Sequence, residues 1–420
     1  MPFPSDQERT YRPPWTFRAA STATVGVVGF LSRMFLYVFS KPEVHGLDRF
    51  LEILDGRSDE QARERGLVTV SNHLSVYAIY LRFQQVFTQI TIRYANFWMC
   101  RLDDPMIWGF LPFSYHWNPS NSRWSLASHD ICFKNAFAAA FFTYGQTLPT
   151  QRLAHSKYGG LFQPTMTEVI RLLSDPHSPS PTTKSPSEPP APQTYVSPAE
   201  ADPFSTNHLT YTTNGLDAFP RPTLYPSRRH SWIHIFPEGM IHQHPAKVMR
   251  YFKWGVARLI LEAEPCPDVL PMWIDGPQEV MSERRTWPRP MPRAGKHVEV
   301  TFGELVDTGA VFGRFRERWR ELKARSRRKQ AASFDAVGEA QTVDRLGEVS
   351  DDFLRHSPEA EQLRIDVTLA VRNEVLKVRR SRGLPDEDPK VSLAETWRRE
   401  GRKSRNEEGE MDDQSVVKDM

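Results

Sequence analysis

The sequence has few cysteines, no large excess of charge of either sign and only one long apolar run. Its three cysteines, Cys100, Cys132 and Cys266, are odd in number and lack Cys-x-x-Cys spacing, which excludes a disulfide scaffold and a cysteine zinc site. The 54 basic and 51 acidic residues give a net charge of +3, which argues against general nucleic-acid binding. A mean hydropathy of −0.52 excludes a membrane protein with many spans. Neither the P-loop nor the dinucleotide-binding glycine pattern is present, and we expect no cofactor and no metal ion.

The apolar run lies near the N-terminus, from Ala23 to Phe39. No acidic residue occurs between Thr10 and Pro42, and Arg33 interrupts the run. A run of this length is at the lower limit for crossing a bilayer, and an arginine inside it is costly there. The pattern therefore favours an amphipathic anchor that lies in the plane of a membrane, with a buried first helix of the domain as the alternative. We expect residues 1–45 to form a membrane-anchoring segment.

Short runs rich in β-branched and aromatic residues alternate with helical patterns along the middle of the chain. The clearest helical pattern covers Phe252 to Ala263, where Val256, Leu259 and Ile260 share one face. Strands separated by helices predict an α/β domain, with a sheet flanked by helices. The expected strands are Leu67–Val70, Trp232–Phe236, Val269–Ile274 and Val298–Phe302.

Proline and charge divide the rest of the chain. Residues 176–230 hold 12 of the 34 prolines, which predicts a disordered insert between two parts of the catalytic domain, 46–175 and 231–310. Residues 311–400 are expected to be a basic helical region, with one helix from about Pro358 to Arg382. The excess of arginine and lysine from 314 to 329 suits contact with anionic lipid, and a solvated charged helix is the alternative. The tail, 401–420, is polar and is expected to be disordered.

Four segments carry side chains suited to catalysis. His73 follows the expected strand Leu67–Val70, and the carboxyl end of a strand is where α/β sheets place their sites. The segment Asp103-Asp-Pro-Met-Ile-Trp-Gly109 offers carboxylates that can orient an imidazole, and Arg152 offers a guanidinium for a phosphate. The segment His234-Ile-Phe-Pro-Glu-Gly239 puts a carboxylate and a flexible glycine beyond a second strand, where we expect His234 to be a packed strand residue rather than a base.

These segments resemble the glycerolipid acyltransferase superfamily, and more narrowly its phospholipid–lysophospholipid transacylases. The Phe-Pro-Glu-Gly segment is typical of the superfamily, whereas Phe252-Lys-Trp-Gly255 and Asp130-Ile-Cys-Phe133 point to the transacylases. The resemblance covers roughly residues 15–310 without the proline-rich insert. It rests on Ser71-Asn-His73, Asp103–Gly109, Arg123-Trp124, Asp130–Phe133, His234–Gly239, Arg250–Ile260 and Leu270-Pro-Met-Trp273.

The resemblance implies a membrane-bound acyltransferase that exchanges acyl chains between phospholipids and lysophospholipids without coenzyme A, with cardiolipin remodelling as its role. It implies mitochondrial inner and outer membranes, on the side of the intermembrane space, as the location. His73 would be the general base, Asp103 would orient its ring, and Arg152, Glu238 and Gly239 would hold the phosphate and glycerol part of the lipid. An acyl-CoA-dependent lysophospholipid acyltransferase and a catalytically inactive membrane-associated isoform are the alternatives.

The spacing of the catalytic pair departs from the family pattern. The family has four residues between the histidine and the aspartate, whereas His73 and Asp103 lie thirty positions apart. Removal of the 25 residues 77–101 restores the family spacing. The sequence permits codons with intron boundaries and a branch site in this segment, and we interpret it as a retained, translated intron. A genuine loop specific to one lineage is the alternative.

Overall fold

One seven-stranded sheet organises the protein. The computed structural model describes residues 14–74, 103–153, 155–175, 210–222, 228–282, 291–337, 346–397, 409–410 and 416–417. The strand order is β1-β9-β8-β2-β7-β3-β4, and all neighbours run parallel except β8 and β9. The strands are β1 (Lys41–His45), β2 (Leu67–Val70), β3 (Trp124–Ser128), β4 (Thr147–Thr150), β7 (Trp232–Ile235), β8 (Asp268–Asp275) and β9 (His297–Phe302). The predicted α/β class is confirmed.

Side chains that alternate along the central strands bury both faces of the sheet. Val68 and Val70 of β2 belong to one apolar core, and Leu67 of the same strand belongs to the other. Strand β8 divides in the same way, with Trp273 in the first core and Met272 in the second. A strand buried on both faces reads as a continuous apolar run, which is why the sequence predicted these strands.

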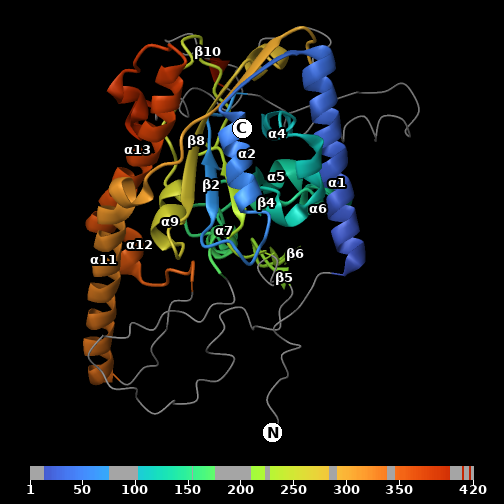
Figure 1. Ribbon diagram of the computed structural model, residues 1–420. Coiled ribbons are helices and arrows are strands. Elements are labelled where there is room, and N and C mark those ends of the chain that lie inside the picture. Colours follow the sequence, from blue (N-terminus) through green and yellow to red (C-terminus); the bar gives the residue numbers. More distant parts are fainter. Residues whose placement is uncertain are drawn as a thin grey trace.

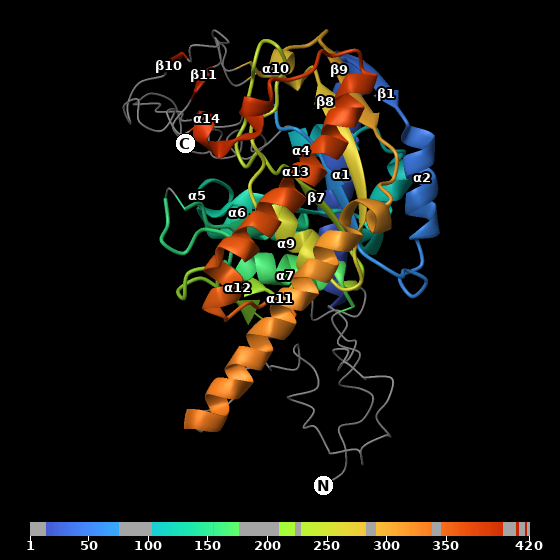
Figure 2. The ribbon, with the colours of Figure 1, turned by 90° about the vertical axis from the view of Figure 1, so that its left-hand side faces the viewer.

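Helices cover the two faces as separate layers (Figures 1 and 2). One layer contains α1 (Trp15–Met34), α2 (Leu47–Gly56), α4 (Asp103–Trp108) and α6 (Ala136–Tyr144). The other contains α7 (Pro164–Leu173), α9 (Gly255–Glu262), α11 (Thr308–Val337), α12 (Asp352–His356) and α13 (Pro358–Ser381). Helix α11 therefore lies across the sheet from α1.

Helix α1 rests on the domain along a stripe of small residues. Its buried positions are Ser21, Val25, Gly26, Gly29 and Ser32, and a Cβ atom on Gly29 would lie 2.7 Å from the ring of His116. Helix Trp15–Phe39, which includes the π-helical turn Phe35–Phe39, is long and apolar enough to cross a membrane by length and composition. Because one side of it packs on the domain, its outward side carries the exposed apolar residues: Trp15, Val27, Phe30, Leu31, Met34, Tyr37, Val38 and Phe39.

The charge inside the apolar run has partners in the domain. Arg33 Nη1 donates to the carbonyl oxygens of Gly109, Phe110 and Leu111, at 3.0 to 3.3 Å, and its guanidinium lies 4.5 Å from the ring centroid of Tyr37. Arg33 thus anchors α1 to the residues that follow α4.

The structure corrects three expected boundaries. Residues 41–45, assigned to the anchoring segment, form β1 and pair with β9, because Val44 packs against the second core. The expectation of disorder throughout 176–230 is wrong for 210–222, where β5 (Thr210–Tyr211) and β6 (Phe219–Pro220) pair and bury Tyr211 and Phe219. Residues 311–400, predicted as a basic helical region separate from the domain part 231–310, do contain the helices α11 and α13, but both helices contribute to the first core.

Two predicted helices are confirmed, and some predicted segments lie outside the described residues. The helix predicted from Pro358 to Arg382 is confirmed as α13, and the helix predicted from Phe252 to Ala263 as α9. Residues 77–101 and 176–209 lie outside the described residues. Of the tail, only the antiparallel pair Gly409–Glu410 and Val416–Val417 is described.

Candidate active site

His73 lies at the carboxyl end of the central strand β2, and its backbone is held on both sides. The amide N–H donates to Glu238 Oε1 at 2.8 Å, and the carbonyl oxygen accepts from the N–H of His242 at 3.0 Å. The imidazole stacks on Phe236 with ring centroids 4.4 Å apart, and the residue is 7% exposed. Two hydrogen bonds to neighbouring loops thus fix the backbone of His73, and the stacking on Phe236 fixes its ring.

Glu238 joins His73 to a second loop. Its Oε2 accepts from the N–H of Arg250 at 2.9 Å, and its Oε1 accepts from His73. Burial raises the pKa of Glu238 to about 7, although the two N–H donors act in the opposite direction. The predicted contact of Glu238 with substrate stays a prediction, while its position connects the two loops that carry His73 and Arg250.

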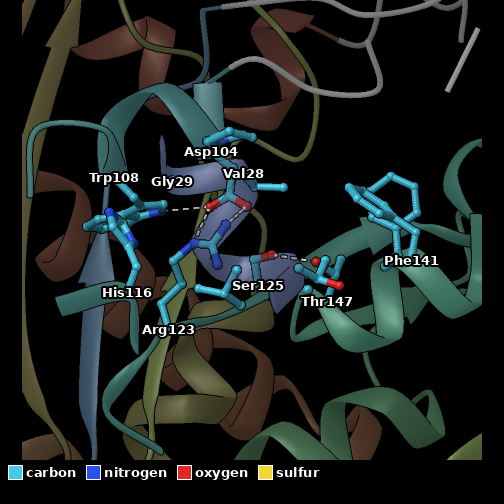
Figure 3. A pocket seen from close by; sticks show the side chains of 14 residues that line it. Val28, Gly29, Asp104, Trp108, His116, Arg123, Ser125, Phe141 and Thr147 are labelled. Carbon is cyan, nitrogen blue, oxygen red and sulfur yellow. Dashed lines mark hydrogen bonds and ion pairs between the residues drawn. The ribbon is translucent and has the colours of Figure 1, made fainter. Parts of the chain in front are cut away.

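Asp103 is the first residue of α4, and its side chain lies outside the described part of the chain. The next residue, Asp104, forms a bidentate pair with Arg123, with Nε–Oδ1 and Nη2–Oδ2 distances of 2.9 and 2.5 Å. Trp108 Nε1 also donates to Asp104, at 2.8 Å (Figure 3). Burial alone would raise the pKa of Asp104, but the charge and hydrogen bonds of Arg123 lower it below its ordinary value. This buried pair fastens the start of α4 to the residue before β3, and the prediction did not assign it a role.

His234, on β7, is buried beneath this site. Its Nδ1 lies 2.9 Å from Thr69 Oγ1, its Nε2 lies 3.4 Å from Ser71 Oγ, and its ring contacts Trp108 and Phe236. Burial lowers its pKa to about 3. The structure agrees with the expectation of a packed strand residue.

This burial predicts a pH dependence of stability. The folded state keeps His234 neutral down to about pH 3, whereas the unfolded chain protonates it near 6.5, so its contribution is present above pH 6.5 and is lost as the pH falls. Replacement His234→Gln should therefore make the free energy of unfolding less dependent on pH between 6 and 4, by up to about 1.4 kcal/mol per pH unit. Chemical denaturation of both proteins across this range measures the slopes. Equal pH slopes of the unfolding free energy in the two proteins would show that His234 is not the cause of this dependence.

Arg152, which follows β4, has a protein partner. Its Nε lies 3.1 Å from Oδ1 of Asp130, and its Nη2 contacts Oδ2 of the same carboxylate. The Asp130-Ile-Cys-Phe segment thus supplies the counter-charge of the predicted phosphate ligand. Both side chains of this pair are partly exposed, and the contact of Arg152 with phosphate stays a prediction.

Lys253 is a cation that the sequence-based prediction missed. Burial, followed by the charges of Arg250 and Arg152, lowers the pKa of Lys253, so both guanidinium groups act on this amine. Its side chain lies against Gly239, where an added Cβ would be 2.7 Å from Lys253 Nζ, and Gly239 has a φ of +66°. Gly239 therefore makes room for Lys253 beside the Glu238 loop. Lys253 stands within the Phe-Lys-Trp-Gly segment, which carries the family resemblance, and its place in that segment was the one sign in the sequence of a functional cation.

An open-mouthed cavity lies between α1, α4 and α6 (Figure 3). Val25 and Val28 of α1 and Phe141 and Phe142 of α6 give it apolar walls. Asp104, Arg123, Ser125 and Thr147 give it a polar side. Its wall residue Trp108 contacts His234, whose ring contacts Phe236, on which His73 stacks. A chain of three successive ring contacts thus connects the wall of the cavity to His73.

Among the described residues, one group has side chains close enough to suit a metal ion. Glu43, His297 and Glu299 offer ligand atoms within 4.8 Å of one another on β1 and β9. Arg382 already forms ion pairs with both carboxylates, so a guanidinium provides the positive charge there.

No family model matches the chain. The chain is 30% identical over 397 residues to the protein named Tafazzin of Saccharomyces cerevisiae, covering 92% of this chain and 84% of that protein. It is 25% identical to Tafazzin of Drosophila melanogaster over 68% of this chain and 51% of that protein. It is 26% identical to N-acylphosphatidylethanolamine synthase of Arabidopsis thaliana over 64% of each protein.

Proposed function

Because this chain belongs to the tafazzin family and is a phospholipid acyltransferase, we propose that it exchanges acyl chains between phospholipids and lysophospholipids without coenzyme A. The observation that carries the proposal is His73, which stands at the carboxyl end of β2 with its backbone held by Glu238 and His242. An imidazole fixed in this way can meet the hydroxyl group of a bound lipid in one orientation.

The chemistry needs a base, because an alcohol is a poor nucleophile at neutral pH. The neutral ring of His73 takes the proton of the lysophospholipid hydroxyl as its oxygen attacks the ester carbonyl of the donor phospholipid. The tetrahedral intermediate then collapses, the donor's ester bond breaks, and His73 returns the proton to the departing glycerol oxygen. The donor leaves as a lysophospholipid, and no side chain of the protein is acylated.

Asp103 is the proposed partner of the second ring nitrogen. A carboxylate there fixes the tautomer of the imidazole and stabilises the imidazolium. With residues 77–101 absent, four residues separate His73 from Asp103, which places them about one helical turn apart. The Asp104–Arg123 pair supports this role, since it holds the start of α4 in place.

The cations near Gly239 are the proposed ligands of the lipid phosphate. The charges of Arg152 and Arg250 disfavour the charge of Lys253, and a phosphate bound by the three side chains would relieve this repulsion. The predicted roles of Glu238 and Gly239 then become indirect, because Glu238 holds the loop of Arg250 and Gly239 leaves room for Lys253.

Loss of the Lys253 charge should therefore weaken lipid binding. We expect Lys253→Met to raise KM for a short-chain phospholipid by roughly 10- to 100-fold, as expected for removal of one charged hydrogen bond, with a smaller change in kcat. Steady-state kinetics measure both constants, and Lys377→Met is the matched control because Lys377 lies exposed on α13 beside Glu374. An unchanged KM in the Lys253 variant would remove this residue from the phosphate site.

Membrane contact is assigned to the outward side of α1. That side carries exposed aromatic and aliphatic residues along the helix, while the other side packs on the domain, an arrangement that suits a helix in the plane of the bilayer. The cavity behind α1 has apolar walls that suit part of an acyl chain. The basic helix α11 lies across the sheet, so contact of α1 with one flat membrane leaves α11 facing solution (Figure 1).

The cellular role proposed from the family is cardiolipin remodelling at the mitochondrial membranes, on the side of the intermembrane space.

An assay that supplies phospholipid donor and lysophospholipid acceptor, with and without acyl-CoA, tests the reaction. Transfer without acyl-CoA is the expected result. Transfer only with acyl-CoA would make the chain an acyl-CoA-dependent acyltransferase, and acylation of the amine of phosphatidylethanolamine would move the assignment to N-acylation.

A further inference from the structure

The chain after α13 turns back and reaches the loop that carries Arg250. It continues through the 3-10 turn η7 (Pro389–Ser392) and the short helix α14 (Ala394–Trp397). Within this return, Glu387 has a side chain that is only 2% exposed. Its Oε1 accepts from the N–H of Met249 at 2.7 Å, and its Oε2 accepts from Arg372 Nη2 at 2.5 Å. Arg379 is its second cationic partner, at 3.3 Å.

Arg372 and Arg379 of α13 donate hydrogen bonds to carbonyl groups of the same loop. Arg372 donates to the carbonyl oxygens of Arg250 and Met249, at 3.1 and 2.8 Å. Arg379 donates to those of Lys247 and Ala246, at 3.0 and 3.3 Å. Residues 247–250 belong to no helix or strand, so these side chains satisfy backbone groups that secondary structure leaves free.

Trp397 covers the same loop from the outside. It is 5% exposed, and its indole N–H donates to the carbonyl oxygen of Val391 at 2.8 Å. The guanidinium of Arg250 lies 4.7 Å from its ring centroid, and the ring of His242 lies 4.9 Å from it.

Both loop residues that Trp397 touches are one or two hydrogen bonds from His73. The N–H of Arg250 is bound to Glu238, which also binds the N–H of His73, and the N–H of His242 is bound to the carbonyl oxygen of His73. Displacement of the loop would therefore shift the backbone of His73 and the guanidinium of Arg250 together.

We propose that the C-terminal return, residues 384–397, positions the active site, with Glu387 and Trp397 as positioning residues for acyl transfer. Glu387 neutralises two buried guanidinium groups and binds the loop backbone, and the ring of Trp397 packs on the guanidinium of Arg250. The expected changes in kcat/KM and KM rest on the proposed function. The expected change in hydrogen exchange of the loop rests on the loop geometry alone.

The first test compares two buried ion pairs in the full chain. Glu387→Gln keeps the shape of the side chain and removes its charge. Glu262→Gln is the matched control, because Glu262 pairs with the buried Arg258 at the far end of α9 from the loop. Hydrogen exchange of peptides covering residues 244–253 should accelerate at least tenfold in Glu387→Gln and stay unchanged in Glu262→Gln, and kcat/KM for acyl transfer should fall at least tenfold only in the former. Equal behaviour of the two variants in exchange and in kcat/KM would overturn the proposal.

A second pair of variants avoids the buried charge. Trp397→Ala should raise KM for phospholipid at least fivefold, because Arg250 loses the ring that holds it, and Trp397→Phe should restore KM to within twofold of the original. An unchanged KM in Trp397→Ala would also overturn the proposal. If neither the unsubstituted chain nor the form lacking residues 77–101 transfers an acyl group, the proposed function fails, while the exchange rates of 244–253 still decide whether the return holds the loop.

Discussion

Replacement of His73 by alanine should lower the rate of acyl transfer by roughly 10²- to 10⁴-fold, the range lost with a general base. The fold should tolerate the change, because the bonds of His73 to Glu238 and His242 use backbone atoms that alanine keeps. The side chain loses its stacking on Phe236, which we expect to cost about 1 to 2 kcal/mol. Initial rates in phospholipid vesicles and thermal unfolding of the same samples measure the two effects.

His234→Gln is the control for this experiment. His234 is as close to Phe236 as His73 is, but its nitrogens lie against Thr69 and Ser71 beneath the site. We expect that variant to keep most of its turnover. Retained turnover in His73→Ala would remove His73 as the base, and equal losses in both variants would point to packing rather than proton transfer.

Deletion of residues 77–101 should raise the rate of acyl transfer at least about tenfold, equivalent to 1.4 kcal/mol of activation free energy. The deletion shortens the connection between His73 and Asp103 from 29 residues to 4. Two causes act in the same direction. Closing the longer connection costs about 1.8 kcal/mol more in loop entropy, which is of the size of the expected effect. The segment is also rich in Tyr, Phe and Ile, and such side chains compete with lipid for apolar surface beside the catalytic pair.

Rates of the two forms, assayed at equal concentration in the same vesicles, test this expectation. Equal turnover would show that the long connection is compatible with catalysis. Transcripts provide an independent test, because the 25 residues correspond to 75 bases. Transcripts that all retain these bases would eliminate the intron interpretation and leave a genuine loop.

The sequence predicted four strands, of which β2, β7 and β8 contribute to both large cores and β9 contributes to one. Strand β2 consists of apolar or β-branched residues, and β7 and β8 consist mainly of them. Strands β3 and β4 were not predicted, since Trp124-Ser-Leu-Ala-Ser128 and Thr147-Leu-Pro-Thr150 contain residues with low strand propensity. Their place in the sheet depends on pairing with β7 and with each other, which no local pattern reveals.

In the site too, features set by neighbouring residues were predictable from the sequence, whereas contacts between distant segments were not. The position of His73 after a strand was predictable from the residues around it. The partners of Arg372 were not, because the carbonyl groups that it binds lie 122 and 123 residues away in the chain. A charged residue on a predicted helix is usually solvated, and only tertiary structure reveals that Arg372 and Arg379 are buried. Lys253 was missed for a related reason, since its neighbours Arg152 and Gly239 come from other segments.

The stoichiometry of transfer tests the central claim most directly. The form lacking residues 77–101 is incubated, without acyl-CoA, in vesicles that contain phosphatidylcholine with deuterated acyl chains and lysocardiolipin, and the lipids are quantified by mass spectrometry. Exchange between lipids predicts that each deuterated chain gained by lysocardiolipin is matched by one molecule of lysophosphatidylcholine, and that His73→Ala forms neither product. Absence of deuterated cardiolipin unless acyl-CoA is added would contradict the account.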